Sequence, residues 1–123
     1  MLFRSWTQRG SNVTVAMSST SYLAGIAVSS ASSGTSCTAT IDNVSITGLD
    51  AGATQGAQAS TVVGSLNPTG SDSLAGGIYT ITAGGPDIST SSTTDACRYI
   101  NFPISNSTNC TLTARVVSMS GGL

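Results

Sequence analysis

The chain has 123 residues, a usual length for one domain, and only 7% of them are charged, so its net charge at pH 7 is −1. Its four Lys and Arg residues are too few to form the cation cluster that binds a phosphate backbone, so nucleic acid is not an expected partner. No apolar run approaches the roughly 20 residues that span a bilayer, so membrane insertion is not expected either.

Ser and Thr make up about a third of the residues, and hydrophobic residues make up 39%. This composition differs from the highly charged, weakly hydrophobic composition of disordered chains. Small polar and β-branched residues with many glycines favour a β-rich extracellular protein.

The sequence of residues 1–48 predicts three or four strands. No stretch in it places apolar residues at the spacing of a helix. One strand is predicted at residues 6–15 and a buried strand at residues 22–30. A turn is predicted at 31–34, followed by a closing strand at 35–47. In that closing strand Ile41, Val44 and Ile46 carry the apolar pattern up to Gly48.

Residues 49–60 are small, polar and rich in Gly and Ala, which indicates a linker. A second series of strands follows, at residues 62–66, 77–82, 96–102 and 110–117, with turn signals between them. The sequence therefore predicts three parts. Residues 1–48 are the last strands of one β-unit, 49–60 are a linker, and 61–123 are the first strands of a second β-unit.

The two flanking parts resemble opposite ends of one domain type, the bacterial extracellular laminin G-like domains of the concanavalin A-like lectin/glucanase superfamily. Residues 1–48 resemble its C-terminal third, through Trp6-Thr7 and the segments 13–17, 22–28, 34–35 and 38–44. Residues 61–120 resemble its N-terminal third, through the segments 77–82, 84–88, 95–99 and 112–118.

The resemblance implies an all-β, antiparallel, jelly-roll-like β-sandwich of the kind that carries sugar-binding or adhesive functions in secreted proteins. The inverted order and the missing central strands imply a sandwich that is incomplete or permuted. Three arrangements are open: the halves close on each other, neighbouring chains complete each half by strand addition, or the chain is part of a longer repetitive protein.

The three cysteines suggest different roles. Cys97 and Cys110 flank a loop between two predicted neighbouring strands, so they form either a cross-strand disulfide or two reduced core thiols. Cys37 is predicted to be either a buried thiol or the partner of a cysteine in another chain or segment. A disulfide would place the protein in an oxidising compartment.

The acidic residues are expected to have mainly structural roles. Asp42 is expected to anchor a loop by hydrogen bonds. Asp87 and Asp95 flank a loop rich in Ser and Thr, where the default role is turn formation and the alternative is a contribution to a Ca²⁺ site. No other cofactor is expected, and the chain has no His or Cys-x-x-Cys pair that would suggest zinc.

The aromatic residues have two interpretations. Trp6 and Tyr99 either belong to the core and to cross-strand pairs or form a surface on which a sugar ring stacks. No catalytic residue is identified, because the chain lacks the His, Lys and Glu side chains that act as bases or as paired carboxylates.

The sequence thus predicts a non-enzymatic extracellular structural subunit, or a repeat segment, of a surface fibre or filament. It would be a homo-oligomer or polymer assembled through β-strand complementation, since low charge leaves little repulsion between copies. The alternative is a carbohydrate-binding or adhesion module of a larger secreted protein, with a glycan as its partner.

Overall fold

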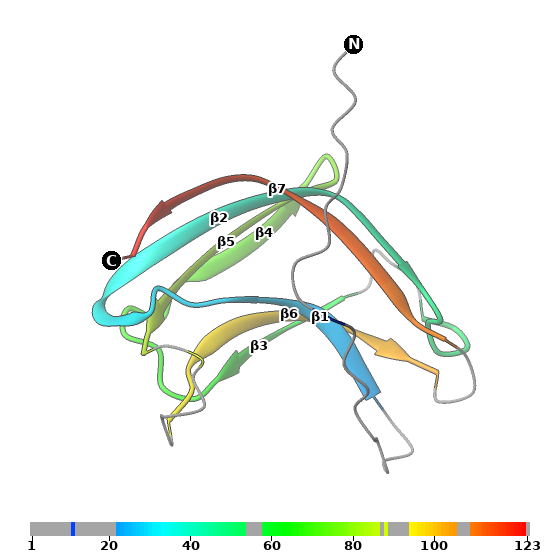
Figure 1. Ribbon diagram of the computed structural model, residues 1–123, viewed down its shortest axis with the longest axis horizontal. Helices are drawn as coiled ribbons and strands as arrows, with labels where there is room; N and C mark the ends of the chain where they lie inside the picture. The colour runs from blue at the N-terminus through cyan, green and yellow to red at the C-terminus, as the bar shows by residue number, and fades with distance from the viewer. Residues whose placement is uncertain are drawn as a thin grey trace.

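The computed structural model describes residues 11, 22–53, 58–86, 88, 94–105 and 109–122. Within these ranges the chain forms seven β-strands and no helix. The strands make two antiparallel sheets that pack against each other, so the protein is an antiparallel β-sandwich, and the predicted fold class is confirmed. In Figure 1 the four-stranded sheet is the upper layer and the three-stranded sheet is the lower one.

Each sheet has a linear order of strands. The smaller sheet has the order β1-β6-β3, and the larger sheet has the order β4-β5-β2-β7. In chain order the strands are β1 (Tyr22–Val28), β2 (Ser32–Thr47), β3 (Ala59–Val63), β4 (Ser71–Ala75), β5 (Ile78–Gly85), β6 (Cys97–Ile104) and β7 (Thr111–Gly121). No described segment is a helix long and apolar enough to cross a membrane.

The long strand β2 lies between β5 and β7, and both of these neighbours come from the second half of the chain. In the other sheet β1 pairs with β6 over its whole length. Each sheet therefore combines strands from the two predicted units, as expected if the halves close on each other. The final two residues of the predicted linker, Ala59 and Ser60, belong to β3.

Alternating side chains produce the core. In β5, Tyr79, Ile81 and Ala83 point inward and are at most 4% exposed, whereas Thr80 between them is exposed. The core cluster consists of Val28, Cys37, Ala39, Ile41, Val44, Ile46, Tyr79, Ile81, Ala83, Ile100, Phe102 and Ile104.

A bulge explains why the apolar pattern of β2 skips a step between Ile41 and Val44. The pairing of β2 with β7 shifts between Asp42 and Ser45, and Asn43 has a φ of 49°, in the left-handed region that Asn tolerates. The extra residue resets the alternation, so Ile41 and Val44 are both buried, at 4% and 8% exposure.

The sandwich is closed along the side where β3 and β4 lie. Arg98 of β6 donates to the Asp72 carboxylate of β4 at 2.6 Å and to the backbone carbonyls of Thr69 and Gly70 at 3.1 and 3.2 Å. Ser60 of β3 donates to the same carboxylate. Both charged side chains are largely buried, so this cluster, here called the closed seam, joins the two sheets through charge-assisted hydrogen bonds.

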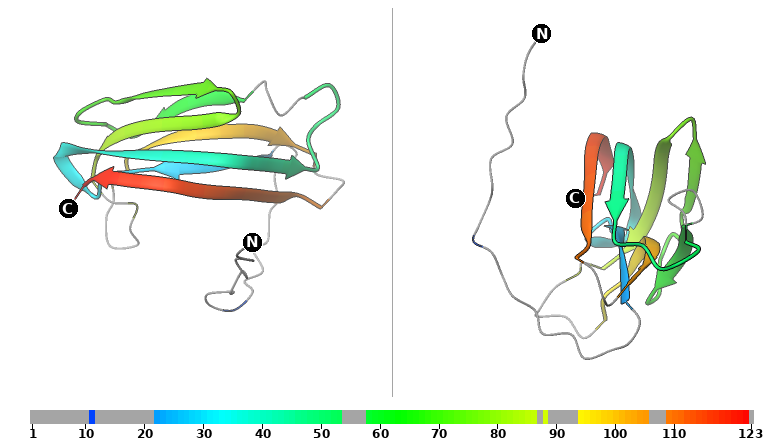
Figure 2. Two further views of the ribbon diagram at one scale, coloured as in Figure 1. Left: turned by 90° about the horizontal axis from the view of Figure 1, so that it is seen from above. Right: turned by 90° about the vertical axis from the view of Figure 1, so that its right-hand side faces the viewer.

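The opposite side of the sandwich is the one where β1 and β7 are the edge strands. Among the described residues, no side-chain hydrogen bond joins β1 to β7. The larger sheet has one strand more than the smaller sheet. On this side the edge strand of the larger sheet is β7 (Figure 2). We call this side of the sandwich, beside β1 and β7, the open seam.

Candidate functional site

The most distinctive surface is the edge strand β7, which spans 11 residues and is the longest of the four edge strands. At its start Leu112 and Ala114 pack against the core. Further along, Val116 and Met119 pair with the buried residues Ile41 and Ala39, so they lie on the same inner face.

Yet Val116 is 57% exposed and Met119 is 63% exposed. The smaller sheet ends at β1, and the last part of β7 is exposed along its whole length. Val117, which stands opposite no single residue of β2 because the pairing shifts there, is 53% exposed. The last six residues of β7 therefore form an apolar, uncovered strand edge at the open seam.

The edge has few of the features that prevent strand addition. Proteins protect edges with short strands, Pro, Lys, inward-pointing charges and bulges, and of these β7 has the bulge at Val117. β7 has no Pro, and its single charge, Arg115, points to the outer face, where it forms a two-pronged ion pair with Asp42 of β2. This hydrogen bonding lowers the pKa of Asp42 and raises that of Arg115. The pair leaves little net charge on the edge.

Asp42 thus has a different role from the predicted one. It does not anchor a loop, because it lies inside β2 at the bulge and holds β7 through Arg115. Sequence reasoning missed this partner because the two residues are 73 positions apart, and the only available signal was that both lie on the polar face of an alternating strand.

The three cysteines are free thiols. Cys97 begins β6, whereas Cys110 lies beside Gly48, at the end of the sandwich where β6 finishes. Strands β6 and β7 belong to different sheets, and β6 alone separates the two ends by roughly 20 Å. The structure therefore does not support the predicted Cys97–Cys110 disulfide.

Two of these thiols are core residues. Cys37 is 2% exposed in the middle of the upper sheet, as in the buried-thiol alternative. Burial raises the pKa of the Cys97 thiol, and the charge of Asp95 raises it further. Cys97 is therefore protonated and weakly nucleophilic at neutral pH.

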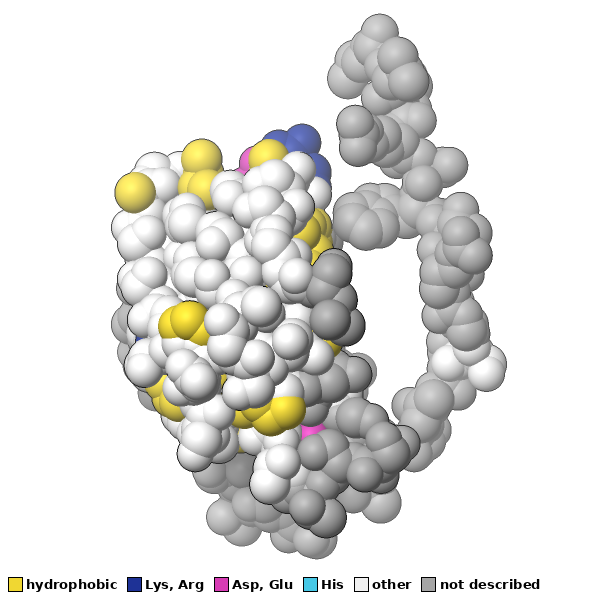
Figure 3. All heavy atoms as spheres, turned by 90° about the vertical axis from the view of Figure 1, so that its left-hand side faces the viewer, with side chains coloured by type: hydrophobic (Ala, Val, Ile, Leu, Met, Phe, Trp, Pro, Cys, Tyr) yellow, Lys and Arg dark blue, Asp and Glu magenta, His cyan; other side chains and the backbone are white. Residues whose placement is uncertain are grey.

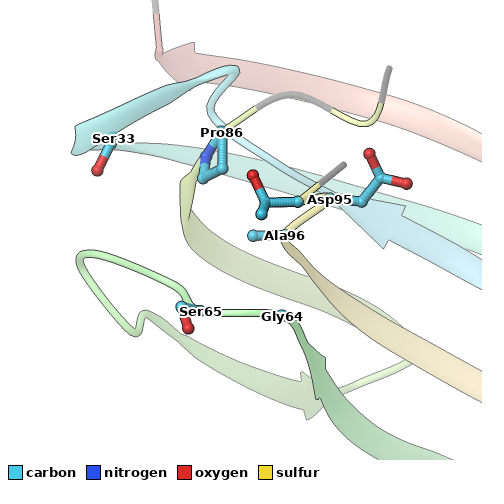
Figure 4. Close-up of a pocket in the computed structure, with 7 residues that line it drawn as sticks. Ser33, Gly64, Ser65, Pro86, Asp95 and Ala96 are labelled. Atoms are coloured by element: carbon cyan, nitrogen blue, oxygen red, sulfur yellow. The ribbon is translucent and has the colours of Figure 1, made fainter. Parts of the chain in front are cut away.

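A shallow hollow of about 550 Å³ lies at one end of the sandwich. It is lined by Ser33, Gly64, Ser65, Pro86, Thr94, Asp95 and Ala96. In Figure 4 the carboxylate of Asp95 points away from Ser33 and Ser65, so the polar groups do not converge on one point.

The proposed Ca²⁺ ligands are only partly placed. Asp95 lies at the hollow, and Asp87 lies outside the described residues. In the described part of the chain, no three His, Cys, Asp or Glu side chains are close enough together to hold a metal ion.

Tyr99 lies on the outer face of the smaller sheet, and its hydroxyl donates to the Leu23 carbonyl at 3.3 Å. Its ring covers Gly25 of β1, where an added Cβ would lie 2.8 Å from the ring. A half-buried aromatic ring over a strand glycine stabilises the pairing of β1 with β6. Trp6, the other proposed sugar-stacking residue, lies outside the described residues.

The face shown in Figure 3 is largely uncharged, with hydrophobic side chains in separate patches. No protein-family model matches the chain, and no curated protein or solved structure is significantly similar to it.

Proposed function

We propose that this chain is a non-enzymatic extracellular structural subunit, or a repeat segment, of a surface fibre or filament. Copies would join by pairing their edge strands into continuous sheets, which is the mode of recognition that main-chain hydrogen bonds supply. The observation that carries the proposal is the long, apolar and uncovered edge of β7, with Val116, Val117 and Met119 more than half exposed.

Three further features support the proposal. The larger sheet has free edges on opposite sides, β4 and β7, and a chain that pairs at both edges forms an open polymer. Exposed apolar side chains also lie at and beside the β4 edge, where Leu74 is 39% exposed and Ile78, the first residue of β5, is 44% exposed. With a net charge of −1, neighbouring copies repel each other little.

The proposal assigns no catalytic role to the chain, because the sequence lacks the His, Lys and Glu side chains on which the common hydrolytic mechanisms depend. The resemblance to extracellular laminin G-like domains supports the assignment to the cell surface.

Sedimentation velocity combined with electron microscopy tests the proposal. We expect the purified chain to form filaments or a concentration-dependent series of oligomers. A cooperatively folded chain that stays monomeric from micromolar to submillimolar concentration would contradict it.

The second candidate is a carbohydrate-binding module, which the half-buried Tyr99 on the outer face of the smaller sheet favours. It predicts retention on a glycan array that is lost in Tyr99→Ala and kept in Tyr99→Phe. Binding by neither the parent chain nor the Phe variant would remove this candidate.

A further inference from the structure

We infer that β7 is a self-pairing edge, at which two copies join their β7 strands antiparallel around a two-fold axis and unite their larger sheets into one. The inference rests on the proposed assembly through edge strands and specifies one of its interfaces.

The backbone of β7 sets the first requirement for a partner. As the last strand of its sheet, β7 pairs with β2 on one side only, and about half of its N–H and C=O groups point the other way. In the single chain water satisfies these groups, and a continuous ladder along the 11 residues requires another extended strand. A second β7 is such a strand, of the same length.

The side chains set the second requirement. A partner strand must bring apolar side chains to the inner face, beside Val116 and Met119, where β1 leaves the upper sheet uncovered. A two-fold axis perpendicular to the sheet keeps the inner faces of both copies on the same side. Val116 and Met119 of the two chains then lie side by side in one apolar stripe, and water is excluded from the flanks at which they face each other.

Charge sets the third requirement and favours a second copy over a charged partner. The one charged residue of the edge, Arg115, is already paired with Asp42 of its own chain. An acidic or basic peptide would therefore find no complementary charge at this edge, whereas a second copy brings the same neutral surface.

The other edge strands meet these requirements less well. Strands β3 and β4 have only five residues each, and the inward-pointing Asp72 of β4 is already bound to Arg98 at the closed seam. Strand β1 has seven residues, with Gly25 in its interior. Among the edges of the described strands, β7 is therefore the one suited to self-pairing.

Sedimentation equilibrium of Met119→Lys and of Val116→Lys tests the inference. Each variant places like charges near the two-fold axis, where they lose water and repel each other. Both side chains are more than half exposed in the single chain, so the fold should tolerate either change, and circular dichroism checks this. The matched control is Leu74→Lys, an inner-facing and exposed position on β4 at the opposite edge of the same sheet.

We expect dimer dissociation constants at least about tenfold higher in both β7 variants, and an unchanged β7 dimer in Leu74→Lys. If the parent chain assembles and the folded β7 variants assemble equally well, the self-pairing of β7 is refuted while the proposed function stands. If the parent forms only a dimer that the β7 variants lose, self-pairing holds and the filament proposal fails. A parent chain that stays monomeric refutes both.

Discussion

The two sides of the sandwich are built in opposite ways. At the closed seam, the hydrogen bond between Arg98 and Asp72 joins the two sheets. Ser60 also donates to Asp72, and Arg98 also donates to the turn before β4. At the open seam, β7 extends past β1, and apolar side chains remain in water. In this chain the two sheets are joined at the closed seam, whereas the end of β7 stays exposed at the open seam. The incomplete side is therefore where a partner strand gains the most contact.

The largest effect is expected at the closed seam. Arg98→Ala leaves the largely buried Asp72 carboxylate without its cation, and we expect a loss of about 2–3 kcal/mol in the free energy of unfolding. Urea unfolding measures it. Combining Arg98→Met with Asp72→Asn removes both charges and should restore part of the loss. A change below about 0.5 kcal/mol in Arg98→Ala would show that the seam is not held by this pair.

The next effect tests how β1 is held at the open seam. Because β1 has no side-chain hydrogen bond to β7 among the described residues, its position depends on its pairing with β6. A Cβ at Gly25 would lie 2.0 Å from the Ile100 carbonyl oxygen and would also meet the Tyr99 ring. We expect Gly25→Ala to destabilise the chain by about 1–3 kcal/mol in urea unfolding. The exposed Ala27→Ser on the same strand serves as control and should have little effect.

A third prediction compares the covered and uncovered parts of the inner face of β7. Leu112 packs against the core, so Leu112→Ala should cost about 1–2 kcal/mol of unfolding free energy. Met119 faces the same way but is 63% exposed. Met119→Ala should therefore change the free energy of unfolding by less than about 0.5 kcal/mol at concentrations where the chain is monomeric. Equal losses would mean that the same chain covers both positions.

The smallest effect concerns the outer face of β7 and depends on pH. The hydrogen bond from Arg115 holds the pKa of Asp42 below its ordinary value of 3.8. The contribution of this pair to stability is therefore present above that value and is lost as the pH falls through the lower pKa of the folded state. Thermal unfolding of Arg115→Ala should show a slightly lower Tm than the parent near pH 6, and the difference should shrink toward pH 2. A constant difference would contradict this.

The sequence predicted the sandwich and most of the described strands, though not β4, because both depend on local patterns. The alternation of Ile78–Thr82 and the turn signals around it are readable without any partner. The assignment of strands to sheets depends on distant residues, and for this reason the Cys97–Cys110 prediction failed: consecutive strands β6 and β7 lie in different layers.

The closed seam could not be predicted either, because Arg98 and Asp72 are 26 positions apart and neither belongs to a recognisable motif. The exposure of Val116 and Met119 also depends on tertiary structure. In the sequence these residues resemble core positions, and only the packing of the two sheets in the folded chain shows that they are exposed.

Amide hydrogen exchange as a function of protein concentration tests the central claim most directly. If the open seam is where copies join, the outward-pointing amides of β7 exchange fast in the dilute monomer and slow down as concentration rises, while the closed seam is unchanged. Exchange of the β7 amides that is equally slow at every concentration would mean that the strand edge is already covered within a single chain, and would contradict the account.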